Sequence, residues 1–236
     1  MVADLHIHTA LSPCAEDDMT PNNIVNMAAL CGIDCIAVTD HSSCKNCGAL
    51  IAAARLADSP LCVIPGMELT TSEEIHVICL FPDIESAMSF DRTVEAALPD
   101  IQNRPQIFGR QLLMNEYDEI IGEFPKLLLS ASQIDVYSAV KVVGALGGIA
   151  YPAHIDRDSF SILSNLGMIP EDLDISVAEL SAGADRLNFS LPYRIITASD
   201  AHRLSSISEE SVQVLDVRNP TPKKVIDFLK AKQAGF

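Results

Sequence analysis

Six histidines are placed where their imidazoles could bind metal ions. All of them lie within a short predicted strand or just after its end, and most have an acidic residue within two positions; they are His6, His8, His41, His76, His154 and His202. Imidazole nitrogen and carboxylate oxygen are ligands that Zn, Mn and Fe ions share. The count of histidines is ordinary, but their placement predicts a metal site rather than six isolated side chains.

Two pairs of these residues show a spacing typical of shared ligands. His6 and His8 are two positions apart in a predicted strand, so their side chains leave the same face. Asp200 and His202 repeat this spacing near the other end of the chain. Buried imidazoles so close together pack poorly unless they share a ligand, so we expect these pairs to hold metal.

Strands that alternate with helices must position these side chains. The predicted strands are residues 4–8, 34–39, 61–64, 75–80, 149–153, 175–180 and 195–199, and the predicted helices are about 20–32, 46–57, 84–97, 134–146 and 221–233. The alternation is typical of parallel βα units. Seven such strands favour an α/β fold, a distorted seven-stranded (β/α) barrel, over an open sheet.

The interval 81–148 is longer than one helical crossover requires. It contains Arg110–Met114 and Ile120–Ile121 on either side of the polar turn Asn115–Glu119. This pattern predicts an inserted hairpin. We therefore expect a single barrel domain over residues 1–236, with an insertion or subdomain at 81–148.

Composition sets the class of protein. The chain has 236 residues, of which 48% are hydrophobic and 20% charged, and this excludes a disordered or collagen-like chain. Its N-terminus lacks the apolar region of a signal peptide and its seven cysteines are an odd number, so a cytoplasmic protein with reduced thiols is expected. The net charge of −16 should repel membranes and duplex nucleic acid.

Six motifs carry a family resemblance when they are taken in order. They are D-L-H-I-H-T, T-D-H, G-M-E, I-H-V-I-C-L, P-A-H-I-D-R and A-S-D-A-H, and they span residues 4–202. This ordered set strongly resembles the polymerase and histidinol phosphatase family, called PHP. The resemblance implies a distorted seven-stranded barrel, a cluster of two or three divalent metal ions at its rim, and phosphoester hydrolysis.

The resemblance also assigns ligands to two metals that share one carboxylate. The first metal would be held by His6, His8, Glu68 and Asp200. The second would be held by Glu68, His76 and His154. A carboxylate can bridge two ions because it has two oxygens, which an imidazole lacks.

A third metal would take His41 and His202 together with an acidic residue of the loop that follows the first strand. The alignment of this loop favours Glu16, and its neighbours Asp17 and Asp18 are rivals. Acidic residues are also common at the start of a helix without any metal, so a two-metal site stays open.

Several other side chains could support the reaction. The candidate catalytic residues are Glu68, His202 and Arg157. The Arg157 guanidinium could bind phosphate oxygens or form an ion pair with Asp156. Asp4 and Asp40 either orient neighbouring imidazoles or cap turns. Glu179 is either a buried carboxylate that supports a ligand or an ordinary residue of the rim. Cys44 and Cys47 have C-x-x-C spacing, but one pair does not make a structural zinc site.

The sequence thus predicts a metal-dependent phosphoesterase that cleaves a small phosphomonoester or nucleotide-like ester, with a metal-bound hydroxide as nucleophile. The ions could be Zn, Mn or Fe. The expected partner is a small phosphorylated substrate, without membrane or duplex nucleic acid; the oligomeric state is not readable. Two alternatives remain: amidohydrolase-like hydrolysis of another bond, and a metal-binding regulatory module without turnover.

Overall fold

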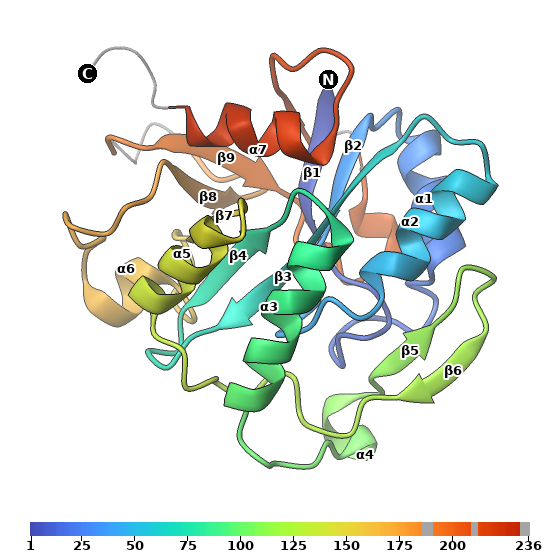
Figure 1. Cartoon of the computed structure of the whole chain (residues 1–236), viewed down its shortest axis with the longest axis horizontal. Coiled ribbons are helices and arrows are strands. Elements are labelled where there is room, and N and C mark those ends of the chain that lie inside the picture. The colour runs from blue at the N-terminus through green and yellow to red at the C-terminus, as the bar shows by residue number, and fades with distance from the viewer. Residues whose placement is uncertain (186–190, 209–211, 232–236) are drawn as a thin grey trace.

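A six-stranded sheet forms the centre of the molecule (Figure 1). The computed structural model describes residues 1–185, 191–208 and 212–231. The strand order is β10 (Gln213–Val214), β1 (Val2–Ile7), β2 (Cys35–Val38), β3 (Cys62–Thr70), β4 (His76–Leu80) and β7 (Ile149–Pro152). The strands β1, β2 and β3 are parallel, as expected for βα units, whereas β10 pairs with β1 in the antiparallel direction.

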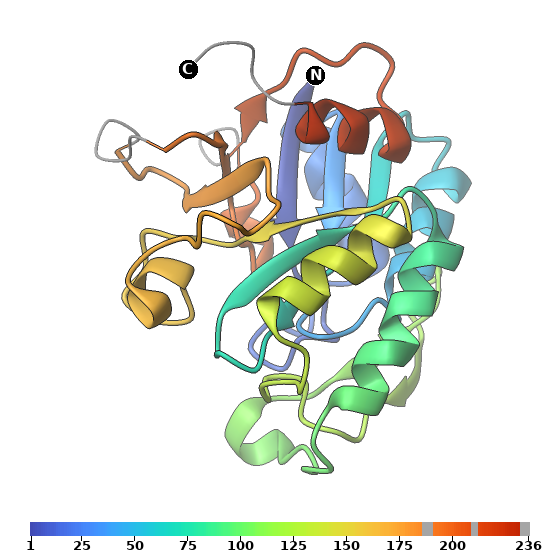
Figure 2. The ribbon, with the colours of Figure 1, turned by 60° about the vertical axis from the view of Figure 1, so that its left-hand side comes forward.

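The predicted distorted barrel of seven strands is found only in part, because its strands do not close into a barrel. The sheet curls into half a barrel, and β8 (Val177–Ser181) and β9 (Arg194–Ala198) form a separate parallel pair (Figure 2). This pair meets β1 through an isolated bridge between Ile7 and Ala201, where the His8 N–H donates to the Ala201 carbonyl at 2.9 Å. Among the described residues, the pair joins the half-barrel at the end of β1 and also just after β7, where the Ile155 N–H donates to the Glu179 carbonyl at 2.8 Å.

The direction of β4 also differs from the expectation of an all-parallel sheet. Only residues 71–75 separate β3 from β4, which is too short for a helical crossover, so the two strands form a hairpin. Furthermore, β3 continues through Glu68 instead of ending at Ile64, because all nine of its residues find buried positions. The hairpin places His76 opposite Thr70, so the start of β4 shares an edge with the end of β3.

Seven helices follow or flank the strands in the described part of the chain. They are α1 (Pro21–Leu30), α2 (Cys47–Leu56), α3 (Ile84–Ala97), α4 (Pro105–Phe108), α5 (Val136–Ala145), α6 (Ile162–Leu166) and α7 (Pro222–Lys230). Thr20 and Thr221 cap α1 and α7, each followed by a proline at the first helical position. The predicted end of the last helix at Gln233 lies outside the described residues.

The interval 81–148 contains α3, a small hairpin and α5. The hairpin joins β5 (Leu112–Met114) to β6 (Ile120–Glu123). Figures 1 and 2 both place α4 at the end of the molecule opposite α7. Because the Leu112 N–H donates to the Ala10 carbonyl at 2.8 Å, the hairpin lies against the loop that follows β1.

Apolar side chains form two main clusters. One includes Leu5, Ile64 and Tyr151 together with Val225 and Leu229 of α7. The other, larger cluster fills the space between the sheet and the helices α1, α2, α3 and α5. None of the described helices is both long enough and apolar enough to span a membrane.

Candidate metal centre

The six histidines converge at one edge of the strands. His6 lies in β1, His8 and His41 follow β1 and β2, and His154 follows β7. His76 begins its strand instead of ending it, but the antiparallel direction of β4 brings it to the same edge. The structure therefore brings these histidines together, and their role as metal ligands stays a prediction.

Glu68 lies at the centre of this group and is 1% exposed. Its Oε1 lies 2.8 Å from Nδ1 of His76 and 3.1 Å from Nε2 of His154. Its Oε2 lies 3.0 Å from Nδ1 of His41 and 3.4 Å from Nε2 of His8. The two oxygens therefore face different histidines, as a carboxylate between two cations would.

His6, His8 and Asp200 form the next part of the centre. The Nε2 atoms of His6 and His8 are 3.1 Å apart, and Asp200 Oδ1 lies 3.2 Å from the first and 3.1 Å from the second. Ligand atoms within 4.8 Å of one another make three groups: His6–His8–Glu68–Asp200, His41–Glu68–His76 and His8–His41–His202. His41 thus belongs to two groups, whereas the sequence placed it at the third metal alone.

The donor chemistry fits divalent cations. Buried ring nitrogens and carboxylate oxygens face one another, and Nδ1 of His41 has no hydrogen-bond partner among the described residues although Glu68 is close. Imidazole and carboxylate together suit Zn, Mn and Fe. The arrangement therefore fits metal binding, and the identity and number of ions are taken up below as proposals.

Burial and mutual charge set the protonation of the centre. Burial alone would raise the pKa of Glu68, but the imidazoles of His76, His6 and His41 hold this pKa well below its ordinary value. Burial lowers the pKa of His41 to about 4 and that of His202 to about 3, with His8 adding to both shifts. Both rings are therefore neutral at pH 7 and keep a lone pair for a cation.

Two of the acidic residues left open by the sequence support ligand imidazoles. The Ser12 hydroxyl donates to Asp40 Oδ1 at 2.7 Å and lies 2.9 Å from Nδ1 of His8, so Asp40 acts on His8 through Ser12. Glu179 Oε1 lies 2.9 Å from Nδ1 of His6, with both side chains buried. Such contacts fix the orientation of a ligating histidine and leave its other nitrogen for metal.

Asp4 makes a different contact. Its Oδ1 accepts the backbone N–H of Ser199 at 3.1 Å and that of His6 at 3.4 Å. Burial raises the pKa of Asp4 to about 6 against these bonds. Asp4 therefore joins β1 to the end of β9 instead of orienting an imidazole ring.

The acidic loop after β1 contributes no member to the three ligand groups among the described residues. Glu16, Asp17 and Asp18 are all exposed. The Glu16 backbone N–H donates to the His202 carbonyl at 2.9 Å, so the loop lies beside the His8–His41–His202 group. Ligation by Glu16 stays a prediction.

Arg157 reaches the centre through Asp200. Its Nη1 lies 2.7 Å from Asp200 Oδ2, and its Nε donates to the Ser181 hydroxyl at 3.3 Å. Asp156, the expected rival partner, accepts the Ser181 backbone N–H instead. Because the residue keeps 43% of its side chain exposed, one end of the guanidinium remains accessible from solvent.

Strained backbone gathers around the centre. His154 and Asp200 adopt positive φ values of 27° and 51°, and Ser42 next to His41 has a φ of 46°. Residues other than glycine adopt such angles at a cost, which is smallest for asparagine and aspartate, and residues held at a high cost cluster at functional sites. No sequence pattern predicted this strain, and none predicted the role of Phe160, whose ring stacks on His76.

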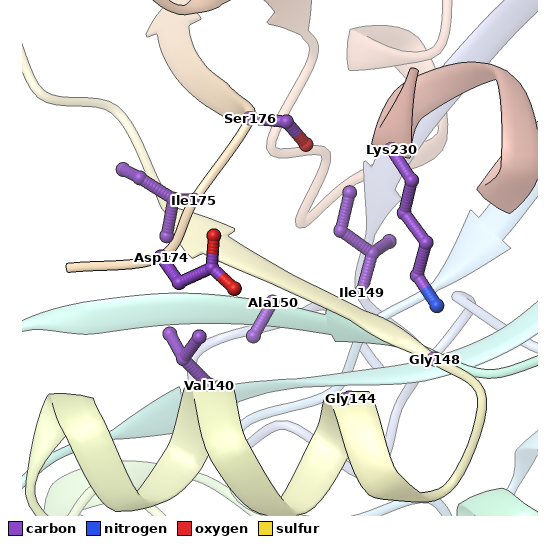
Figure 3. Close-up of a pocket in the computed structure, with 9 residues that line it drawn as sticks. All are labelled: Val140, Gly144, Gly148, Ile149, Ala150, Asp174, Ile175, Ser176 and Lys230. Atoms are coloured by element: carbon purple, nitrogen blue, oxygen red, sulfur yellow. The ribbon is translucent and has the colours of Figure 1, made fainter. Parts of the chain in front are cut away.

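Features away from the centre are of another kind. The thiols of Cys44 and Cys47 are buried and both donate to the Gly66 carbonyl, at 3.2 and 3.4 Å. A cavity of about 310 Å³ lies between α5, the start of β7 and α7, and it is lined by Ile149, Asp174 and Lys230 (Figure 3). It opens at the end of β7 opposite His154, so it is separate from the histidine cluster.

Comparison with known proteins gives structural neighbours alone. No family model and no curated protein matches the chain. Endonuclease Q from Pyrococcus furiosus matches with 19% identity and a TM-score of 0.64, over 98% of this chain and 56% of that one. A protein named as a metal-dependent phosphoesterase from Bifidobacterium adolescentis matches with 17% identity and a TM-score of 0.54, over 85% of this chain and 87% of that one.

An amidohydrolase from Chromobacterium violaceum also matches, with 17% identity and a TM-score of 0.56, over 90% of this chain and 91% of that one. All three neighbours carry the names of hydrolases. The chain spans about half the length of the endonuclease Q chains that it matches.

One expectation from the sequence is overturned by a second endonuclease Q structure, which holds a 27-mer duplex substrate with an abasic lesion at its active site. This match has 17% identity and a TM-score of 0.58, over 86% of this chain and 50% of that one. The expectation of a small substrate and no duplex nucleic acid is therefore wrong for this fold. The prediction drawn from net charge failed because nucleic-acid binding depends on the local electrostatic field at the site rather than on the total charge.

At these identities the likeness concerns the fold. The chain shares its fold with these neighbours, and its sheet is the half-barrel described above.

Proposed function

We propose that the chain hydrolyses a phosphodiester bond of a nucleic acid in a reaction that depends on divalent metal ions. The observation that carries this proposal is Glu68, whose two oxygens lie within 3.4 Å of ring nitrogens of five histidines. When bound, such ions supply a nucleophile from water at neutral pH and neutralise charge on the phosphate.

Two ligand sets follow from the distances. One ion would be held by His6, His8, Glu68 and Asp200. A second would be held by Glu68, His76 and His154, with His41 near enough to join. A third ion at His41 and His202, completed by Glu16, stays part of the proposal, as does the choice among Zn, Mn and Fe.

The residues around the proposed ligands fix the protonation and the orientation of the imidazole rings. Glu179 Oε1 accepts a hydrogen bond from the Nδ1–H of His6, so Nε2 of His6 is free for metal. Ser12 and Asp40 do the same for His8 through a hydroxyl. Arg157, paired with Asp200, is the cationic side chain placed to bind phosphate oxygens.

Nucleic acid is favoured over a small ester by the likeness to endonuclease Q, which covers 98% of this chain. The net charge of −16 opposes a general affinity for nucleic acid. Attraction would therefore arise locally, from bound cations and Arg157. The whole endonuclease's activity is carried by a chain about twice as long, so lesion specificity is left to the experiment.

We further propose that the segment 81–148 is an insertion that shapes the entrance to the centre. Its hairpin contacts the loop after β1, and the Asn46 side chain links the two by donating to Thr9 Oγ1 at 2.9 Å and to the Leu112 carbonyl at 3.0 Å. The same loop carries Ser12, which contacts His8. A substrate that approaches the cluster from this side would meet the hairpin.

The test uses labelled oligonucleotides of one sequence as a single strand, an intact duplex and a duplex with an abasic site. Protein supplied with Mn or Zn should cleave at least one of them, a chelator should stop cleavage, and added metal should restore it. Cleavage of amide substrates without any cleavage of phosphodiesters would favour the amidohydrolase alternative. Full metal content without turnover of either would favour a regulatory module.

A further inference from the structure

Phe160 lies directly beside the metal centre in an unusual setting. Its ring stacks on His76 with centroids 4.7 Å apart and planes 20° from parallel. The Phe160 carbonyl accepts the His76 backbone N–H at 2.9 Å, which fixes the loop after β7 to the start of β4. The phenyl ring is thus held next to His76, which contacts Glu68.

Two features of Phe160 are costly for an ordinary core residue. Its φ is 53°, a left-handed conformation that bulky side chains rarely adopt. It is also 42% exposed, although a phenyl ring gains most when it is fully buried. A ring that served only to hold His76 would be expected to be buried, whereas the Phe160 ring keeps part of its surface exposed to solvent.

The same loop also brings a cation to the metal centre. Arg157 precedes Phe160 by three residues, and its guanidinium lies 2.7 Å from Asp200. An exposed aromatic ring and an exposed arginine beside a site for phosphodiesters form a combination that binds nucleic-acid strands, because bases stack on rings while cations contact the backbone.

We propose that Phe160 is a stacking platform for a nucleobase next to the phosphodiester bond that is cleaved at the metal centre. The proposal rests on the function proposed above and adds a base-binding subsite to it. A base would lie on the exposed surface of the ring while Arg157 contacts the phosphate. Stacking of this kind tolerates every base, so it predicts affinity for bases without sequence preference.

The experiment compares two probes that differ by one base, thymidine 5′-monophosphate and 2-deoxyribose 5-phosphate. Calorimetric titration of the metal-loaded protein should show about tenfold tighter binding of the nucleotide, the size expected for one stacked base. In Phe160→Ala the two probes should bind equally, and Phe160→Trp should restore the preference. Phe160→Gly is a second variant without a ring, whose backbone tolerates the positive φ.

Control measurements separate the platform from other roles. Tyr117→Ala removes an aromatic residue that is 64% exposed in the turn between β5 and β6, and it should leave both affinities unchanged. Elemental analysis should show the same metal content in all variants. If Phe160→Ala loses metal and weakens both probes equally, the ring only positions His76 and the platform is overturned.

The two proposals fail in different ways. No preference for the nucleotide in the parent protein, or a preference that survives in Phe160→Ala, overturns the platform even if oligonucleotides are cleaved. A preference that depends on Phe160 supports the platform even if no oligonucleotide is cleaved, and in that case the nuclease function alone is contradicted.

Discussion

The two ends of the central strands differ in chemistry. At the end that carries the metal centre, buried side chains are charged or polar, and Glu68 is surrounded by imidazoles. At the opposite end, α7 lies against the sheet and its Val225, Ile226 and Leu229 are fully buried in an apolar cluster. One end therefore loses stability to desolvation of polar groups, while the other gains it from burial of apolar surface.

The two ends of the strands also differ in which residue types adopt a left-handed backbone conformation. Opposite the centre, left-handed residues end helices before the next strand: Gly32 after α1, Asp58 after α2 and Gly147 after α5. Glycine and aspartate accept this conformation at little cost. At the centre the left-handed residues include His154 and Phe160, which accept it poorly.

The contrast in backbone conformation marks the same end of the strands as the histidine cluster does. Strain at His154 persists only if the surroundings over-determine its conformation, and the contacts of its ring with Glu68 and His76 do so. In barrels of this kind the carboxyl ends of the strands carry catalysis and the other end carries stability. Substitutions at the two ends should therefore affect different measurements.

The largest effect is expected for Glu68→Gln at the polar end. Loss of the carboxylate that faces five histidines should lower cleavage at least about a hundredfold, because even indirect partners of ligands cost that much. Elemental analysis should show lower metal content. Glu85→Gln, at an exposed position of α3, is the control, and it should keep both the cleavage rate and the metal content of the parent. Near-normal turnover of Glu68→Gln would contradict its bridging role.

At the apolar end, Leu229→Ala should act on stability alone. Removal of a fully buried leucine should lower the free energy of unfolding by about 3 kcal/mol. Metal content of the folded variant should not change. Leu30→Ala, at a position that is 80% exposed on α1, should alter stability by less than about 0.5 kcal/mol. Urea denaturation measures both variants, and an equal loss in the two would show that α7 does not anchor the sheet.

Local sequence signals predicted most elements correctly. Thr20 and Pro21 mark the start of α1, and the Thr20 hydroxyl accepts the Asn23 N–H as the cap requires. The hydrophobic run from Cys35 to Val38 forms β2. These features depend on neighbours in the chain, so composition and spacing suffice to find them.

Pairing across long distances was not readable in the same way. Alternation of strands and helices suggested that every strand is parallel, whereas the short connection before His76 makes β4 antiparallel. The contact of Glu179 with His6 joins residues 173 positions apart, and no local pattern encodes it. Most histidine positions were predictable because their motifs mark strand ends, with His76 at the start of β4 as an exception, but the partner of each ring depends on how the strands curl.

Glu179→Gln tests one of these unforeseen contacts and should have an intermediate effect. The amide removes the charge that holds the Nδ1 proton of His6, so metal affinity should fall about tenfold while the fold is kept. Competition with a chelator measures the affinity, and circular dichroism checks the fold. Glu171→Gln at an exposed position is the matched control, and equal affinities in the two variants would leave Glu179 without a role at His6.

The smallest effect is expected for Arg157→Lys, at the border between the centre and solvent. Lysine keeps the charge but loses the planar fork that can hold Asp200 and a phosphate together. We therefore expect kcat/KM for phosphodiesters to fall roughly threefold to tenfold, in line with the loss of one ordinary hydrogen bond while the charge is kept.

Two readouts decide what Arg157 does, because its contact with Asp200 allows a purely structural role as well. If it binds substrate, Arg157→Lys should keep the metal content of the parent and should be inhibited less by inorganic phosphate. If it only holds Asp200, metal affinity should fall while phosphate inhibition per bound metal stays the same. Arg55→Lys, exposed on α2, should change neither measurement. Since the Arg157 side chain is 43% exposed and its Nη1 already lies against Asp200, we expect the first pattern, which would make Arg157 the link between the buried cluster and the solvent side where substrate would enter.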